Sequence, residues 1–231
     1  MTCVSQPARG GPRGNRGRGR PAGSDSTETR ATILRAARDV FSERGYEATT
    51  FQAIAQRCGF SRPTMHYYFD TKDQIYDELA ADACAMVSEC IAAAKREQSL
   101  LKQLAAFVTA VRRADTPDGS ATRFVIASRL ELHRSPTLRG SSSPIADAVS
   151  GFYRWMAEDA VRRGEIRADV DASAVADLLS AMFWGMGFFA GFVHPPGEVD
   201  EIAKQLHRLL VGRLLDGQPQ PRPLTVAPTP E

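Results

Sequence analysis

The fold is decided by residues 50–69, which read TFQAIAQRCGFSRPTMHYYF. Two short helical patterns meet at Gly59, the first opened by Thr49 with the spacing of a capping box and the second opened by Ser61. Ala55, four residues before the glycine, is small enough for the second helix to cross the first closely. Two short helices joined by such a turn predict a helix-turn-helix, a unit whose second helix enters the major groove of DNA.

The second of these helices carries side chains that suit contact with DNA. Arg62 can reach a guanine edge or a phosphate, and Thr64 can touch a thymine methyl group or donate a hydrogen bond. His66 and Tyr67 can stack or bond to the DNA backbone. We therefore interpret the exposed face of this helix as the reading surface.

Helical spacing continues on both sides of the motif, with no sustained alternation of period two. The sequence therefore predicts an all-α fold, in which a three-helix helix-turn-helix domain precedes a larger helical domain for ligand binding and dimerisation. We expect a disordered basic arm over 1–24, the helix-turn-helix domain over 25–72, the second domain over 73–216 and a disordered tail over 217–231. The expected helices run over 28–44 with Asp25 as cap, over 49–58, from 61, from 71, and over 99–114, 120–134, 144–163, 171–194 and 198–215.

Positive charge is concentrated at the N-terminus, although the whole chain has a formal net charge of only +2. The charged residues of 1–24 are all arginines, and the stretch Gly17–Pro21 resembles the core of an AT-hook. Such a segment can lie in a narrow A·T minor groove with Arg18 and Arg20 spread along its floor. An arm that attracts DNA only electrostatically, or that simply keeps the chain soluble, is the alternative.

Several stretches around the motif carry a family resemblance. They are TETRATILRAA at 27–37, FSERGY at 41–46, GFSRPT at 59–64 and YYFDTKD at 67–73. With them, residues 27–79 resemble the N-terminal DNA-binding domain of the TetR family of regulators. The resemblance implies an all-helical, two-fold symmetric homodimer whose C-terminal domain binds a small molecule and then loses affinity for double-stranded DNA.

The resemblance also implies which residues contact DNA, in addition to Arg18 and Arg20 of the arm. Thr50 and Lys72 stand at helix N-termini, where free N–H groups point towards phosphates. The family usually has tyrosine where this chain has His66, whose imidazole is shorter and can change charge near neutral pH. His66 packed against the long helix that begins near 71 is the structural alternative. The predicted set is Thr50, Gln52, Arg62, Pro63, Thr64, His66, Tyr67 and Lys72.

The second domain is rich in large apolar side chains, most of which we expect to form its core. Collected in one helical domain, they can also line a pocket, in which Arg129, His133 and Tyr153 could orient a ligand. No cluster of acids or bases predicts the charge of that effector, so we expect it to be hydrophobic or amphipathic. The predicted ligand-binding residues are Phe107, Phe124, Arg129, His133, Phe152, Trp155, Met156, Phe183 and Trp184.

The last two predicted helices are expected to form the homodimer. The helix over 171–194 is apolar nearly all round past Leu178, which is typical of a helix buried on more than one side. Two such helices from each of two chains can form a four-helix bundle. A monomer in which these faces are covered within one chain is the alternative. The predicted interface residues are Leu179, Met186, Phe189, Val193, Leu206, Leu209 and Leu210.

Other classes of protein find little support. The sequence has no Gly-x-Ser-x-Gly elbow, phosphate loop or His-Glu-x-x-His, so we expect no enzyme, no catalytic residue and no cofactor. The four cysteines lack metal-site spacing, so we expect reduced thiols and no metal. The longest apolar stretch, Ala181–Val193, is shorter than the ~20 residues of a membrane span, and we expect a cytoplasmic protein. A DNA-organising protein that senses nothing, and an activator in place of a repressor, are the alternatives that stay open.

Overall fold

The computed structural model describes residues 22–138, 143–193, 199–210 and 212, and every regular element within those ranges is a helix. The predicted all-α fold is therefore confirmed. The elements are α1 (Ala22–Ala48), α2 (Phe51–Cys58), α3 (Arg62–Tyr68), α4 (Lys72–Ala94), α5 (Leu100–Ala114), α6 (Ser120–Arg134), α7 (Pro144–Arg162), α8 (Ala172–Phe188), the π-helical turn η1 (Phe189–Val193) and α9 (Val199–Leu210).

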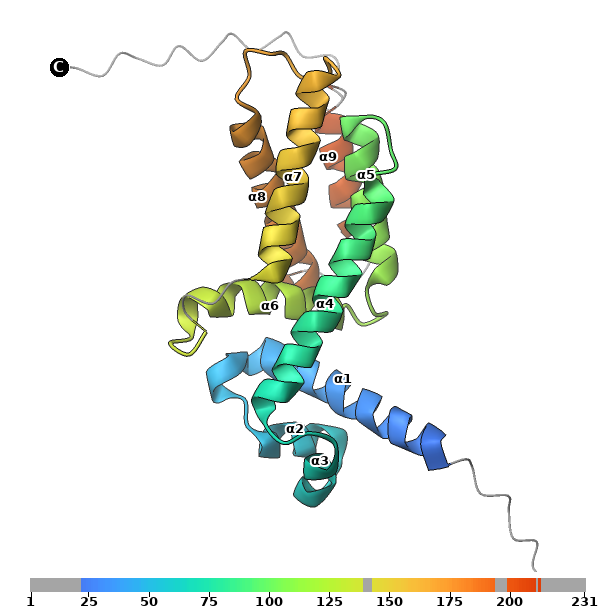
Figure 1. Ribbon diagram of the computed structural model, residues 1–231, viewed down its shortest axis with the longest axis vertical. Helices are drawn as coiled ribbons and strands as arrows, with labels where there is room; N and C mark the ends of the chain where they lie inside the picture. Colours follow the sequence, from blue (N-terminus) through green and yellow to red (C-terminus); the bar gives the residue numbers. More distant parts are fainter. Residues whose placement is uncertain (1–21, 139–142, 194–198, 211, 213–231) are drawn as a thin grey trace, which may run out of the picture.

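The helices form two groups that α4 and α6 join (Figure 1). Helices α1, α2 and α3 lie together at one end, and α4 rises from them to pack against α5 and α7. Helix α7 packs in turn against α8. Helix α6 crosses at the foot of these upright helices and contacts α1 on one side and α8 with η1 on the other. The end formed by α1, α2 and α3 is thus attached to the rest of the molecule through two helices.

Two predicted helix starts differ from the structure. Helix α1 begins at Ala22, so Asp25 lies inside the helix instead of capping it, and the last three residues of the predicted arm are helical. Helix α2 is capped by Thr50, whose side chain accepts a hydrogen bond from the Ala53 N–H, and not by Thr49. Thr49 is buried instead, and its hydroxyl donates to the Gly45 carbonyl at 2.7 Å.

The two groups of helices share one continuous hydrophobic core. At the end formed by α1, α2 and α3, its fully buried residues include Ile33, Ile54 and Met65. Between α5, α7 and α8, the core is aromatic, with Phe107 at its centre 5.0 Å from Phe152 between ring centroids. This continuity lets a change of packing in either half reach the other.

The helix made of α8 and η1 is less covered than the rest. Residues Ala172–Val193 form one run that is long and apolar enough, by length and composition, to cross a membrane. This corrects the sequence-based expectation, because the apolar run extends nine residues further towards the N-terminus than Ala181. One such helix is a weak indication of a membrane span. Only 17% of the tested window is buried, so this helix presents an apolar surface that the described part of the chain does not cover.

Candidate nucleic-acid interface

The helix-turn-helix is built by local side-chain caps. Gly59 ends α2 in the left-handed conformation, with φ of 72°, a region that glycine adopts at little steric cost. Ser61 then caps α3, its Oγ accepting a hydrogen bond from the Thr64 N–H at 3.3 Å. Pro63 lies in the first turn of α3, where a missing N–H leaves no helical bond unmade. These local interactions of Gly59, Ser61 and Pro63 set the angle between α2 and α3.

The inner faces of the two helices are apolar and covered. Ile54 and Met65 are fully buried, and the Cys58 sulfur lies 3.8 Å from the Met65 sulfur across the turn. Because the apolar sides of α2 and α3 face inward, their polar sides must face solvent. The helix-turn-helix expected from residues 50–69 is therefore present in the structure.

The outward face carries most of the side chains that were predicted to contact DNA. Thr50, Gln52, Arg62 and Pro63 are exposed, and Thr64 is half-buried with its hydroxyl 2.8 Å from that of Ser61. Tyr67 is 80% exposed, an unusual position for a large aromatic side chain in a protein without a partner. This face combines a cation, hydroxyl groups and an aromatic ring around a short helix.

His66 is exposed but held by a neighbour from α2. Its ring stacks on Phe51, with 4.8 Å between the ring centroids and 16° between the planes. The alternative in which His66 packs against the long fourth helix is therefore wrong. Phe51 of α2 therefore covers one face of the ring of an otherwise exposed His66.

Lys72 lies differently from what its position at the start of α4 suggests. Its ammonium donates to the carbonyls of Tyr46 at 2.9 Å, Thr49 at 3.2 Å and Glu47 at 3.5 Å. It also stands 4.4 Å from the centre of the Tyr46 ring. All three donors of the ammonium are thus directed at the C-terminal end of α1, where partial negative charge favours a cation. Lys72 ties α4 to α1 in this structure.

Arg18 and Arg20 of the basic arm lie outside the described residues.

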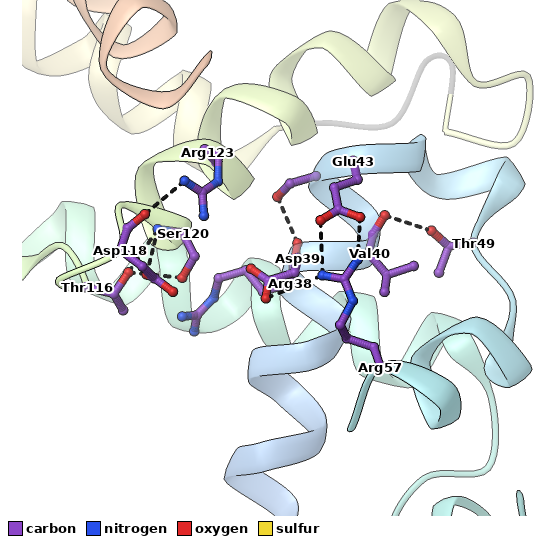
Figure 2. A network of polar contacts seen from close by, with 11 residues as sticks. Arg38, Asp39, Val40, Glu43, Thr49, Arg57, Thr116, Asp118, Ser120 and Arg123 are labelled. Atoms are coloured by element: carbon purple, nitrogen blue, oxygen red, sulfur yellow. Dashed lines mark hydrogen bonds and ion pairs between the residues drawn. The ribbon is translucent and has the colours of Figure 1, made fainter. Parts of the chain in front are cut away.

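Three ion pairs that sequence reasoning missed connect α2 and α4 to α1. Arg57 of α2 donates to Glu43 of α1 at 3.0 Å and lies 3.7 Å from Asp39, as Figure 2 shows. The hydrogen bond from Arg57 lowers the pKa of the Glu43 carboxyl below its ordinary value. Arg30 of α1 pairs with Glu78 of α4. These pairs hold α2 and α4 on α1.

The end of α1 is seated on α6 by a buried carboxylate. Glu131 of α6 is 8% exposed and accepts a hydrogen bond from the Tyr46 backbone N–H at 2.9 Å. Gly45 beside it has φ of 77° and ψ of 174°, a region open almost only to glycine. A Cβ atom at Gly45 would stand 2.8 Å from the Glu131 carboxylate oxygen. Tyr46 and Glu131 are 85 residues apart in the sequence, so no local sequence pattern predicts this contact.

The N-terminal end of α6 is stabilised by hydrogen bonds to Asp118, in the turn that precedes the helix (Figure 2). The Asp118 carboxylate accepts a hydrogen bond from the Ser120 N–H at 3.0 Å, and the carbonyl of Asp118 accepts one from Arg123 at 2.8 Å. The hydrogen bond from Thr116, followed by that from Ser120, lowers the pKa of Asp118 to about 2. The cap stabilises the helix that links the two halves of the molecule.

Most of the predicted ligand-binding residues are packed into the core of the second group of helices. Phe107, Phe124, Phe152, Met156 and Phe183 are buried, and Trp155 and Trp184 pack against them half-buried.

The polar residues predicted to orient a ligand are separated in the structure. Arg129 and His133 pair with each other on α6, 3.2 Å apart, at the surface. The structure has three described cavities, which lie between α4 and α5, between α5, α8 and α9, and between α1, α6 and η1. None of the nine predicted ligand-binding residues lines any of them. Tyr153, fully buried on α7, has a hydroxyl without a described hydrogen-bond partner, and burial raises its pKa.

The predicted dimer residues separate into three groups. Leu179 is buried within the chain, and Met186 and Leu206 line the groove between α5, α8 and α9. Phe189, Val193 and Leu209 are between 44% and 51% exposed. The side chain of Leu210 lies outside the described part of the structure. Exposed apolar side chains of the α8–η1 helix also include Leu178, Phe188 and Phe192, which sequence reasoning left out of the interface.

Comparison with known proteins finds similar sequences for the N-terminal domain and for about 70% of the chain. Residues 33–79 match the family model described as bacterial regulatory proteins, tetR family. The HTH-type transcriptional repressor BepR of Brucella suis is 27% identical over 70% of this chain and 80% of its own length. The repressor AcnR of Corynebacterium glutamicum is 24% identical over 71% of this chain and 82% of its own length.

Solved structures share the fold. The regulator PfmR of Thermus thermophilus, described as a TetR-family protein, superposes with a TM-score of 0.62 at 24% identity, covering 82% of this chain and 96% of its own. AibR, solved with isovaleryl coenzyme A and operator DNA, gives a TM-score of 0.58 at 20% identity over 78% of this chain and 97% of its own. The predicted family resemblance of the N-terminal domain is confirmed by the family model over residues 33–79.

Proposed function

Since the N-terminal domain of this chain is that of the TetR family of bacterial regulators, we propose that the protein is a transcriptional repressor that binds a palindromic operator as a homodimer. We further propose that a small hydrophobic or amphipathic effector releases it. The observation that carries the proposal is the capped pair α2–α3, whose apolar sides are buried and whose exposed face holds Arg62, Thr64 and Tyr67. Such a face suits base edges and phosphates in a major groove.

Dimerisation is proposed because one short helix reads too little DNA to select a site. Two reading helices about 34–36 Å apart enter successive major grooves of one duplex face. The apolar surface along α8 and η1 supplies a contact between copies, since Leu178, Phe188 and Phe192 lie uncovered there. We propose residues 25–72 as the DNA-binding domain and 73–216 as the effector and dimerisation domain, with α4 passing from one into the other.

Release by an effector is proposed to act through α6. This helix contacts α1 through Glu131 and contacts the α8–η1 helix on its other side. An effector that favours a different position of α6 by a few kcal/mol would change the separation of the two reading helices. AibR, which shares the fold, was solved with both isovaleryl coenzyme A and operator DNA, which supports the general scheme.

The relatives in the comparisons are DNA-binding transcriptional regulators and not enzymes. Repression is preferred to activation because BepR and AcnR are both repressors and because occupying a promoter blocks it directly. A DNA-organising protein that senses nothing would bind A·T-rich DNA broadly, without a palindrome. We propose a cytoplasmic location, where the operator is.

The experiment is selection of duplexes from a random pool by the full-length chain. We expect a palindrome whose half-site centres are about 10 base pairs, or a multiple of that spacing, apart. Arg62→Ala should weaken binding to it by about 5- to 150-fold, which corresponds to about 1–3 kcal/mol. Arg154→Ala, at an exposed position on α7, is the matched control and should change nothing. Enrichment of no duplex over random competitor would overturn the proposal.

The basic arm is proposed to adjust operator affinity. If residues 1–21 contact the minor groove through Arg18 and Arg20, deleting them should weaken binding and flatten its salt dependence. Unchanged binding at several salt concentrations would exclude that role.

A further inference from the structure

A groove with a volume of about 370 Å³ lies between α5, α8 and α9. It is on the side of α5 that carries Leu101, Ala105 and Val108, whereas the aromatic core takes the side that carries Phe107. The volume falls within the range of small-molecule sites, which is about 300–1,000 Å³. The groove is therefore distinct from the packed core in which sequence reasoning placed the effector.

The floor of the groove is apolar and comes from three helices. Leu101, Leu104 and Val108 of α5 recur on one helical face, and Met186 of α8 and Leu206 of α9 complete the wall. Met186 and Leu206 were predicted to contact a second copy of the chain. In the structure they face α5 across the groove, while other residues of α8 form its uncovered side. The floor suits a flexible hydrocarbon chain.

The rim of the groove is cationic. Arg112 lies one helical turn beyond Val108 on α5, and Lys204 and Arg208 are four residues apart on α9, on one side of that helix. No aspartate or glutamate is among the lining residues in the described part of the chain. The Lys204 ammonium is 3.5 Å from Glu201 and Arg208 is 3.4 Å from Gln205, both long contacts at exposed side chains.

We propose that this groove binds an amphipathic carboxylate, with its hydrocarbon chain along the apolar floor and its head group between Arg112, Lys204 and Arg208. Charge-assisted hydrogen bonds from three cations to one carboxylate give the site its preference for an anion over a neutral or cationic amphiphile. The inference deepens the proposed function, because it names the chemical class of the effector and the place where it binds.

The groove has a direct physical connection to the DNA-facing half. Met186 of its wall is followed by Gly187, which packs so closely on α6 that an added Cβ would stand 2.6 Å from the Ile126 side chain. A ligand that shifts α8 at Met186 must therefore also shift α6. Helix α6 carries Glu131, which holds the end of α1.

The experiment measures the binding of three probes with a ten-carbon chain to the full-length protein by titration calorimetry. The probes are decanoate, 1-decanol and decyltrimethylammonium, which share the chain and differ in head-group charge. We expect decanoate to bind about tenfold more tightly than 1-decanol, and the cation to bind least tightly. Equal affinity for all three probes would overturn the proposed preference for an anion.

Variants locate the binding site. The double variant Arg112→Gln/Lys204→Gln should reduce decanoate affinity to the level of 1-decanol and leave 1-decanol unchanged. Arg113→Gln is the matched control, since Arg113 lies next in sequence but faces the other groove, between α4 and α5. Val108→Trp, which fills the floor, should abolish binding of both probes. Unaltered decanoate binding in the double variant and in Val108→Trp would overturn the inference.

The outcomes separate this inference from the proposed function. If the selected operator is bound but decanoate is not, the groove assignment fails and the repressor assignment stands. If decanoate binds through Arg112 and Lys204 but no operator can be selected, the groove assignment stands and the repressor assignment fails. If Val108→Trp converts a dimer into monomers, the groove is a contact between copies of the chain, and the ligand assignment is overturned.

Discussion

The α2–α3 unit buries its large apolar side chains, whereas the α8–η1 helix exposes several of them. In α2–α3, Ile54 and Met65 are fully buried and the exposed face is mainly polar. In α8–η1, Leu178 is 58% exposed and Phe188 is 43% exposed. The first unit is therefore complete within one chain and offers its surface to a charged, hydrated partner. The second is apolar and uncovered, and its surface suits another protein surface.

The largest effect is expected when the uncovered surface of α8 is made polar. Leu178→Asp/Phe188→Asp should prevent dimerisation, because each carboxylate would be buried unpaired between two copies at a cost of about 3–5 kcal/mol. We expect dimer affinity to fall by more than about 100-fold, and operator affinity to fall with it. Analytical ultracentrifugation and operator titration measure the two effects.

The control for this variant is Leu130→Asp, which changes a leucine that is 44% exposed on α6. It should leave the oligomeric state unchanged. A double variant that still sediments as a dimer would show that copies of the chain meet elsewhere, and that the contrast between the two regions has another cause.

A second variant tests the contact that attaches the C-terminal end of α1 to α6. Gly45→Ala should lower the free energy of unfolding by about 2–3 kcal/mol, because its backbone region is strained for alanine and its Cβ would meet the Glu131 carboxylate. Gly59→Ala, with φ of 72° and nothing within 4 Å of its Cβ, should cost only about 1 kcal/mol. Equal losses in denaturant unfolding would mean that the Glu131 contact contributes little.

A third test uses the pH dependence of the α6 cap. The folded-state pKa of Asp118, about 2, lies below its ordinary value of 3.8. A lowered pKa contributes stability that is present above pH 4 and is lost as the pH falls from about 4 to about 2.

Asp118→Ala should therefore cost about 1 kcal/mol at neutral pH, the usual contribution of a helix cap. The difference from the unmodified chain should narrow as the pH falls through that window. Thermal unfolding at several pH values measures it, and a difference that stays constant down to pH 2 would contradict the assigned cap.

The smallest expected effects compare two tyrosines from the two halves. The Tyr153 hydroxyl is buried without a described partner, so Tyr153→Phe should leave stability unchanged or raise it by up to about 1 kcal/mol. The Tyr46 hydroxyl donates to Asp73, so Tyr46→Phe should lower stability by about 1 kcal/mol. Chemical unfolding of both variants gives the signs. A loss on Tyr153→Phe would indicate a hydrogen bond to this hydroxyl that the structure does not show.

The parts of the fold that could be predicted from the sequence depend on local signals. Helix caps and stops act within one turn of the chain. The helices that begin or end at Gly59, Ser61 and Thr71 were therefore predicted at nearly the observed positions. The shift of the α2 cap from Thr49 to Thr50 has a tertiary cause. Thr49 is buried against the end of α1, which leaves its neighbour to cap α2.

The remaining parts could not be predicted because their partners are distant in the sequence. Helix α8 is apolar on nearly every side, so its sequence did not indicate which side faces outward, and a rotation of one residue separates buried Leu179 from exposed Leu178. Lys72 was predicted to contact phosphate, but the carbonyls that it binds belong to a turn more than twenty residues earlier. The assignments of DNA, ligand and dimer contacts stay predictions until the variants are measured.

The stacking of His66 on Phe51 has a consequence for the evolution of operator preference. When His66 on α3 is substituted, the stacked pair is lost. The Phe51 ring on α2 then packs against a different side chain and changes its orientation. If His66 contacts DNA as predicted, sequence preference is encoded jointly by Phe51 and His66, which lie fifteen residues apart. Mutational scans that vary one position at a time would underestimate how many operators variants of this protein can recognise. Libraries that vary Phe51 and His66 together would reveal these operators.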